Sequence, residues 1–159
     1  MSFLDQDEKL IELADKVQLV YSPIADVKDF SEEVDVTLVE GAVGNEEQLE
    51  LLRQVRRSSR IVVSLGDCAV TGNATALRNI LNDNSESVLK REFIENTTEN
   101  PQLPKDVPKL LAQAYALHEI VKVDFYLPGC PPSADLIGYM LTELVSGRTP
   151  NIDSKFKYG

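Results

Sequence analysis

Apolar, β-branched runs alternate with amphipathic stretches along most of the chain. Four such runs predict strands at 17–21, 34–43, 60–65 and 121–127. Apolar residues at helical spacing predict helices at 5–16, 46–58, 73–81, 108–117 and 134–147, with caps expected at Asn45 and Ser133. Strands separated by helices indicate crossovers and a mostly parallel sheet. We expect an α/β fold with a flavodoxin-like open sheet and helices on both faces.

The predicted order opens on a helix, with no strand ahead of it. The first strand of a flavodoxin-like sheet is central, and without it two neighbouring strands would leave backbone groups unpaired in the middle of the sheet. We therefore expect residues 1–159 to be a single domain that lacks its first central strand.

Residues 82–108 break the pattern, because they are rich in Asn, Asp, Ser, Glu and Pro and show no sustained periodicity. A long stretch of this kind inside a domain indicates a functional loop or a contact with a partner, and an ordinary surface loop is the alternative.

Composition and motifs argue against several classes of function. The net charge of −10 argues against a nucleic-acid surface, and no apolar run approaches the roughly 20 residues that span a bilayer. Four arginines between positions 53 and 60 suit the carboxyl end of a helix, although a docking patch for an acidic partner is an alternative. There is no glycine-rich dinucleotide motif and no nucleophile–base set, so we expect neither NAD binding nor independent catalysis by this chain.

The two cysteines occupy equivalent places in the predicted fold. Cys68 and Cys130 each follow a predicted strand within a tight Gly/Pro turn, where open α/β sheets bind ligands. Two thiols aimed at one point would form half of a metal or cluster site, since a cubane iron–sulfur cluster takes four thiolates. The alternative to a metal or cluster site is that both cysteines are buried, unreactive side chains. His118 precedes the last strand, and we expect a structural or surface role for it.

At these residues the chain resembles the small subunit of nickel–iron hydrogenases, especially the cytoplasmic, bidirectional, NAD-reducing type. The likeness is carried by Val-Glu-Gly-Ala-Val at 39–43, Gly-Asp-Cys-Ala-Val-Thr-Gly-Asn at 66–73 and Tyr-Leu-Pro-Gly-Cys-Pro-Pro at 126–132. Shorter matches at 22–24, 26–28 and 146–150 extend it over nearly the whole length.

The resemblance implies a subunit that holds a 4Fe–4S cluster between a nickel–iron large subunit and a flavin-containing diaphorase module. It assigns Cys68 and Cys130 as two cluster ligands. It also places Glu40, Gly41, Asp67 and Thr71 in the cluster pocket or at the large-subunit contact. The nickel–iron centre, FMN and NAD would belong to the partner subunits, and the location would be cytoplasmic.

The chain departs from this family at its start. The family's other two ligands form a Cys-x-x-Cys after the first strand, just ahead of a segment like Met1–Asp5 here. One N-terminal segment would therefore contain both the missing strand and the missing ligands. We expect a truncated sequence that binds a cluster poorly or not at all. The alternatives are the 20-kDa-type subunit of a complex I-like or formate-linked assembly, and a cluster-free α/β domain that binds a partner.

Overall fold

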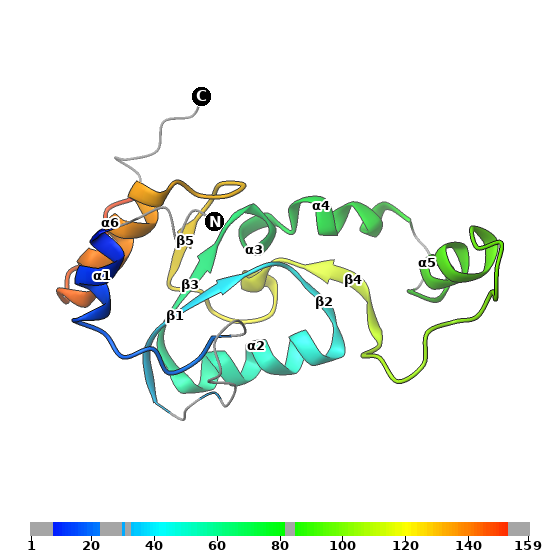
Figure 1. The fold of residues 1–159 in the computed structure, drawn as a ribbon, viewed down its shortest axis with the longest axis horizontal. Helices are drawn as coiled ribbons and strands as arrows, with labels where there is room; N and C mark the ends of the chain where they lie inside the picture. The colour runs from blue at the N-terminus through cyan, green and yellow to red at the C-terminus, as the bar shows by residue number, and fades with distance from the viewer. Residues whose placement is uncertain (1–7, 23–29, 31–32, 82–84, 153–159) are drawn as a thin grey trace.

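Three parallel strands form the central sheet: β1 (Val34–Glu40), β3 (Ser59–Leu65) and β5 (Phe125–Leu127), in the order β1-β3-β5 (Figure 1). The structure is a computed structural model that describes residues 8–22, 30, 33–81 and 85–152. β3 is the middle strand and the most buried one, with Val62 and Val63 fully buried. A strand covered on both faces reads as a continuous apolar run, as β3 does. The predicted α/β fold with a mostly parallel sheet is confirmed.

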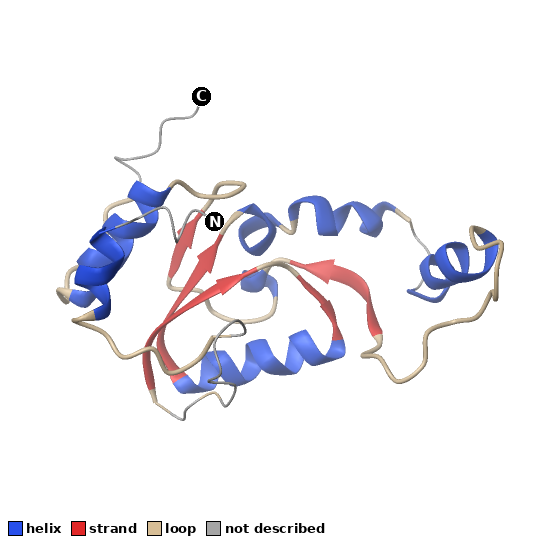
Figure 2. Cartoon of the chain, viewed as in Figure 1, coloured by secondary structure: helices blue, strands red, loops and turns tan. Residues whose placement is uncertain are grey.

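Helices lie on both faces of this sheet (Figures 1 and 2). On one face α6 (Ala134–Val145) packs through Ile137 and Met140 against Val63, and α1 (Glu8–Ala14) contacts α6. Side chains alternate across a strand, so Val39 of β1 joins the core on the other face.

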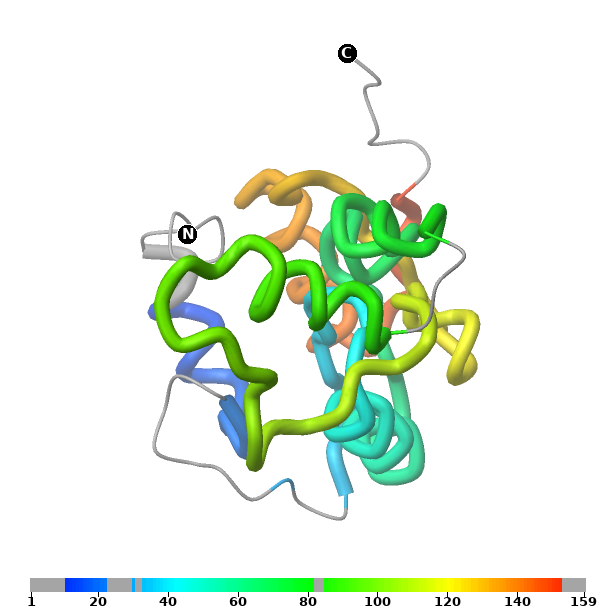
Figure 3. The backbone as a smooth tube through the Cα atoms, turned by 90° about the vertical axis from the view of Figure 1, so that its right-hand side faces the viewer, coloured from blue at the N-terminus to red at the C-terminus, as the bar shows by residue number. Residues whose placement is uncertain are grey.

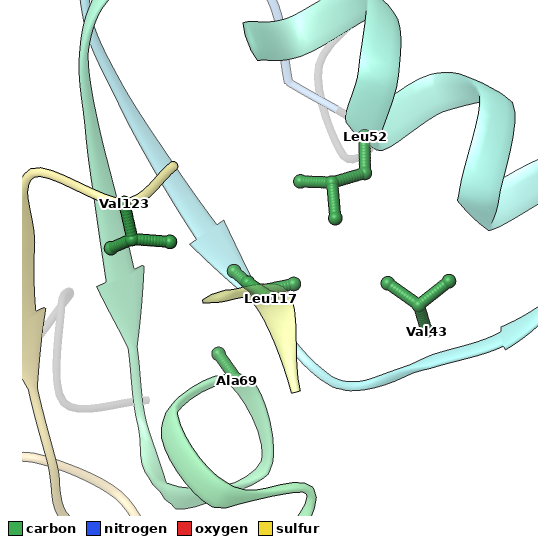
Figure 4. Close-up of a cluster of buried hydrophobic side chains, with 5 residues drawn as sticks. All are labelled: Val43, Leu52, Ala69, Leu117 and Val123. Atoms are coloured by element: carbon green, nitrogen blue, oxygen red, sulfur yellow. The ribbon is translucent and has the colours of Figure 1, made fainter. Parts of the chain in front are cut away.

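The second core lies under α2 (Glu46–Ser58) and is shown in Figure 4. Its buried side chains point toward one another from α2, the short α3 (Asp67–Thr71), β2 (Val43–Asn45) and the loop segments before β5: Val43, Leu52, Ala69, Leu117 and Val123.

Both predicted helix caps are present. The Asn45 side chain accepts a hydrogen bond from the Gln48 N–H at 2.8 Å, and the Gln48 side chain in turn accepts one from the Gly44 N–H at 2.8 Å. Ser133 Oγ accepts a hydrogen bond from the Leu136 N–H at 3.3 Å. Each cap satisfies a backbone donor that has no partner within its own helix.

The helix predicted at 108–117 is wrong. Residues Leu110–Tyr115 form strand β4, which pairs antiparallel with β2, and a short 3₁₀ turn, η4 (Leu117–Glu119), follows it. Alanine, leucine and glutamine favour a helix, but local propensity is a weak prior that a strand partner overrides. The Asn79 side chain supports this strand by donating to the Ala114 carbonyl at 2.7 Å and accepting from the Ala114 N–H at 2.8 Å.

The strand predicted at 17–21 is also not formed, because residues 17–22 adopt neither strand nor helix. Within the described part of the chain, nothing pairs with the edge of β1 that faces away from β3. A strand requires a hydrogen-bonding neighbour, and in a flavodoxin-like order the neighbour of this segment is the first central strand.

Other boundaries shift. The run at 34–43 divides into β1 and β2, the run at 121–127 pairs only at its end, and the N-terminal helix spans residues 8–14 of the predicted 5–16, of which 5–7 lie outside the described residues. The helix predicted at 73–81 is present as α4 (Asn73–Ala76) followed by the 3₁₀ turn η2 (Leu77–Ile80).

Of the predicted loop at 82–108, residues 82–84 lie outside the described residues, and the rest, 85–108, contains helical segments. It begins with α5 (Ser85–Lys90), followed by a π-helical turn (Arg91–Glu95), and then returns to β4. Figure 1 shows this arm at the end of the molecule opposite α6, and Figure 3 views the molecule from that end. No helix in the described ranges has both the length and the apolar character that a membrane span requires.

The arginines at the end of α2 bind locally. Arg56 donates to the carbonyls of Ser59 at 2.6 Å and of Arg60 at 3.1 Å, and it forms an ion pair with Asp124 at 2.6 Å. Burial alone would raise the pKa of Asp124. The Val62 N–H, together with the hydrogen bond and charge of Arg56 and the charge of Lys122, outweighs burial and lowers this pKa below its ordinary value. The group therefore joins α2 to the start of β3 and β5, whereas Arg60 itself lies on β3 and pairs with Asp35.

Candidate cysteine site at the carboxyl rim of the sheet

The three parallel strands end in register. Glu40 of β1 lies opposite Leu65 of β3, and Leu65 lies opposite Leu127 of β5. The loops that follow these strands therefore leave from one rim of the sheet. In open α/β sheets the crevice outside the carboxyl ends of the strands is where ligands bind.

The two cysteines lie in two of these loops. Cys68 is half-buried at the second position of α3, directly after β3 and Gly66. Cys130 is exposed in the loop between β5 and α6. Because neighbouring parallel strands deliver both loops, residues far apart in sequence become neighbours in space.

Three hydrogen bonds join the two loops. The Gly66 N–H donates to the Leu127 carbonyl at 2.7 Å, and the Asp67 N–H donates to the Gly129 carbonyl at 3.0 Å. In the opposite direction, the Gly129 N–H donates to Asp67 Oδ1 at 2.6 Å. Asp67 and Gly129 each immediately precede a cysteine, so this reciprocal pair fixes the backbone just ahead of both thiols.

The remaining predicted site residues lie around this rim. Glu40 is exposed at the end of β1, and Gly41 after it has a left-handed φ of 87°. Thr71 is exposed at the end of α3, and its Oγ1 donates to the Asp67 carbonyl at 2.9 Å. The structure thus brings Asp67 and Thr71 into one hydrogen-bonded unit with the Cys68 loop, and Glu40 and Gly41 stand one strand away from it.

The donor set fits half of a cubane cluster. Among the described residues, no group of three or more His, Cys, Asp or Glu side chains could hold a metal ion. The sequence has two cysteines and one histidine in all. His118 is exposed and packs edge-on against the Tyr126 ring, with ring centroids 6.0 Å apart, which agrees with the expected surface role. By donor type, the two thiols supply half of the four ligands that a cubane cluster takes.

The sequence placed Asp67 among the pocket candidates but did not indicate its bond to Gly129. Asp67 directly follows the glycine after β3, but nothing in the local sequence indicates that it binds a residue 62 positions away. The Tyr126–His118 pair had no such signal. Ser64, on β3 just before Gly66, is fully buried, and its Oγ is the buried side-chain polar atom without a hydrogen-bond partner in the described part of the chain.

The fold and the rim define a class: an open α/β domain that presents two cysteine loops on one edge of its sheet. Residues 1–144 match the family model of the NADH ubiquinone oxidoreductase 20 Kd subunit, and the chain belongs to this family. The resemblance to hydrogenase small subunits is confirmed by relatives within it.

Two curated relatives and one solved structure show how far the likeness extends. The chain is 36% identical to the NAD-reducing hydrogenase HoxS subunit delta of Cupriavidus necator, over 97% of this chain and 76% of that protein. It is 34% identical to a subunit of the F420-non-reducing hydrogenase vhu of Methanocaldococcus jannaschii, over 98% of this chain but only 54% of that protein.

Among solved structures, the chain matches a subunit of the NAD⁺-reducing [NiFe]-hydrogenase in its H₂-reduced state. The TM-score is 0.89 at 41% identity, and the match covers 99% of this chain and 87% of that one.

Proposed function

We propose that this chain is the electron-transfer small subunit of a bidirectional, NAD-linked nickel–iron hydrogenase. The observation that carries the proposal is the reciprocal hydrogen-bonded pair of Asp67 and Gly129, which holds two cysteine loops side by side at the rim of the sheet. The relatives that match over nearly all of this chain bear hydrogenase names, which supports this function over others of the same fold.

Cys68 and Cys130 would hold one side of a 4Fe–4S cluster, whose chemistry is to take up and release one electron at a time. A complete cubane on these residues takes two further ligands from outside the 159 residues.

The four pocket candidates divide into two roles. Asp67 and Thr71 brace the Cys68 loop through the bonds described above, and they act on ligand geometry. Glu40 and Gly41 end the neighbouring strand at the same rim, where a charged side chain and a flexible backbone can contact a partner subunit.

The partners would be a hydrogenase large subunit with the nickel–iron centre and a diaphorase module with FMN and the NAD site. The names of the relatives support a multi-subunit enzyme in general. The cytoplasmic location and the diaphorase partner follow from the NAD-linked type.

The proposed interface with a partner subunit consists of the arm, residues 85–108, together with α4 and η2, which precede it in the chain. Apolar side chains lie exposed on this part of the surface, at Leu77, Ile80, Leu81, Phe93, Leu103 and Val107. Exposed apolar patches mark contact sites, and Leu77, Ile80 and Leu81 follow soon after α3, the helix that carries Cys68.

The family model's own name favours a second candidate, the equivalent subunit of a complex I-like NADH:quinone oxidoreductase. A cluster-free α/β domain that only binds a partner is the third. The three differ in what the assembled complex does with hydrogen, quinone and iron.

The test uses a complex of the chain with its large subunit in which two further thiolate ligands complete the cluster. We expect H₂-dependent reduction of NAD or of a dye by the purified complex, and loss of that activity in Cys68→Ser and Cys130→Ser. Iron and acid-labile sulfide in the small–large heterodimer should fall in parallel, whereas Thr149→Ala, an exposed matched control, should leave both unchanged.

Three results would count against this function. Quinone reduction without hydrogen uptake favours the complex I-like alternative. Absence of iron and sulfide from a stable heterodimer favours the cluster-free domain. A double cysteine variant with the full rate and full iron content would remove the two thiols from the function altogether.

A further inference from the structure

We infer that Asp67 is a positioning residue that fixes the spacing of the Cys68 and Cys130 thiols through its bonds to Gly129. The inference deepens the proposed function and rests on the two thiols acting together there. It concerns the side chain of one residue, and it can be measured on the chain without any cluster.

Asp67 contacts the other cysteine loop through both its backbone and its side chain. Its N–H donates to the Gly129 carbonyl at 3.0 Å, and its Oδ1 accepts from the Gly129 N–H at 2.6 Å. Two bonds in opposite directions between one pair of residues restrict translation and twist, which a single bond does not. The bond to the carboxylate is charge-assisted, and such bonds are stronger than hydrogen bonds between two neutral groups.

Hydrogen bonds within the turn of α3 also fix the backbone of Asp67. Its carbonyl accepts a hydrogen bond from Thr71 Oγ1 at 2.9 Å, and Val70 N–H closes on the Gly66 carbonyl at 3.0 Å. The carboxylate therefore extends from a braced helical turn. Because Cys68 is the next residue, the position of Asp67 constrains the backbone of Cys68 directly. It constrains Cys130 through the bond to Gly129, the residue before Cys130.

Only the side-chain bond depends on the aspartate. The Asp67 N–H to Gly129 bond and the Gly66 N–H to Leu127 bond are made by backbone atoms and survive any substitution that keeps the turn. Removal of the carboxylate should therefore loosen the two loops relative to each other without dismantling the rim.

Charge and positioning predict different outcomes, which makes the inference testable. An effect of the carboxylate charge would act on each thiol separately, and its loss would show in reactions of single thiols. A positioning role predicts instead that binding of one atom by both thiols becomes weaker.

The probe is phenylarsine oxide, added to the reduced full-length chain. Its arsenic binds both sulfurs, and each thiol gives up its proton as the oxide oxygen leaves as water, with no change of oxidation state. Two sulfurs held at a set spacing bind it tightly, because the second bond forms within one molecule.

We expect Asp67→Ala to weaken phenylarsine oxide binding about tenfold, equivalent to about 1.4 kcal/mol, without slowing alkylation by iodoacetamide. Asp67→Asn keeps an oxygen that can accept from Gly129, so its affinity should lie between those of Asp67→Ala and the wild type. The matched control is Asp124→Asn, which removes another carboxylate from a backbone N–H at the opposite end of β3 and β5 and should leave arsenical binding unchanged.

The outcomes separate the two levels of the proposal. If the wild type does not bind the arsenical through both thiols, the proposed cysteine site fails. If the wild type binds it and both Asp67 variants bind equally well, the site stands and the positioning role of Asp67 is wrong. Should Asp67→Ala not fold, Asp67→Leu, which is of similar size and has no acceptor for the Gly129 N–H, takes its place, and wild-type affinity in that variant would overturn the inference.

Discussion

Gly66 and Gly129 face each other across the two cysteine loops, and both have a positive φ, 83° at Gly66 and 134° at Gly129. A Cβ on Gly66 would lie 3.4 Å from the Gly129 carbonyl oxygen. A Cβ on Gly129 would lie 2.6 Å from Pro132 Cα, closer than real side chains come. The close approach that brings the Asp67 N–H and carboxylate onto Gly129 thus depends on a residue without a side chain at position 129.

Gly129→Ala should destabilise the chain by about 3 kcal/mol or more, because backbone strain and a clash with Pro132 add together. Urea unfolding followed by circular dichroism measures this loss. The matched control is Gly147→Ala, where φ is 71° and no atom lies within 4 Å, so strain alone should cost about 1–2 kcal/mol. Equal losses in the two variants would show that the loop can move away from Pro132.

Asp124→Asn should lower the free energy of unfolding at pH 7 by about 1–3 kcal/mol, because it weakens the half-buried pair with Arg56. The pKa of Asp124 is lower in the folded chain than its ordinary value of 3.8. Its contribution is therefore complete above that value and disappears as the pH falls through the folded pKa. The difference between wild type and variant should shrink over that acidic range, as measured by denaturant unfolding at several pH values.

The control for Asp124 is Asp35→Asn. Asp35 pairs with Arg60 at 3.7 Å, and both side chains are largely exposed, so the loss should stay below about 0.5 kcal/mol. A wild type and Asp124→Asn variant of equal stability at pH 7 would contradict the role assigned to the Arg56 pair.

Asn79→Ala should destabilise the chain by about 2–4 kcal/mol, because it leaves both the N–H and the carbonyl of buried Ala114 without their partner. Hydrogen exchange at the Ala114 amide should accelerate more than exchange in β3. Gln113→Ala, at an exposed position of the same strand, should change stability by less than about 0.5 kcal/mol. Unchanged protection of Ala114 would mean that another group holds this strand.

Ile80→Asp should leave the stability of the chain within about 0.5 kcal/mol, because the side chain is 78% exposed. If the arm side of the molecule is the partner interface, binding of the large subunit should weaken about tenfold or more in a titration of the purified subunits. Ile11→Asp, 67% exposed on α1, is the matched control and should bind like the wild type. Equal binding by both variants would place the interface elsewhere.

Much of the fold could be read from local pattern. The apolar run of β3 predicts a buried strand because its neighbours on both faces cover it, and Asn45 and Ser133 predict helix starts because their side chains reach backbone donors three residues on. The positions of Cys68 and Cys130 after strands likewise follow from local signals.

The errors share one cause. Leu110–Tyr115 has a helix-favouring composition, and β2 together with Asn79 makes it a strand. Residues 17–21 have a strand-favouring composition and remain unpaired by any described strand. In both cases pairing with a segment remote in sequence decides the outcome: it is present for Leu110–Tyr115 and absent within the described part of the chain for residues 17–21.

By itself, then, the order of residues determined the alternation of strands and helices, the caps, and the two cysteine turns, since each depends on neighbours within a few positions. The tertiary structure alone decided which strands pair, that their ends align at one rim, and that Asp67 bonds to Gly129 across that rim. Hydrogen bonds between distant loops depend on the register of β3 and β5, and register is a property of the assembled sheet.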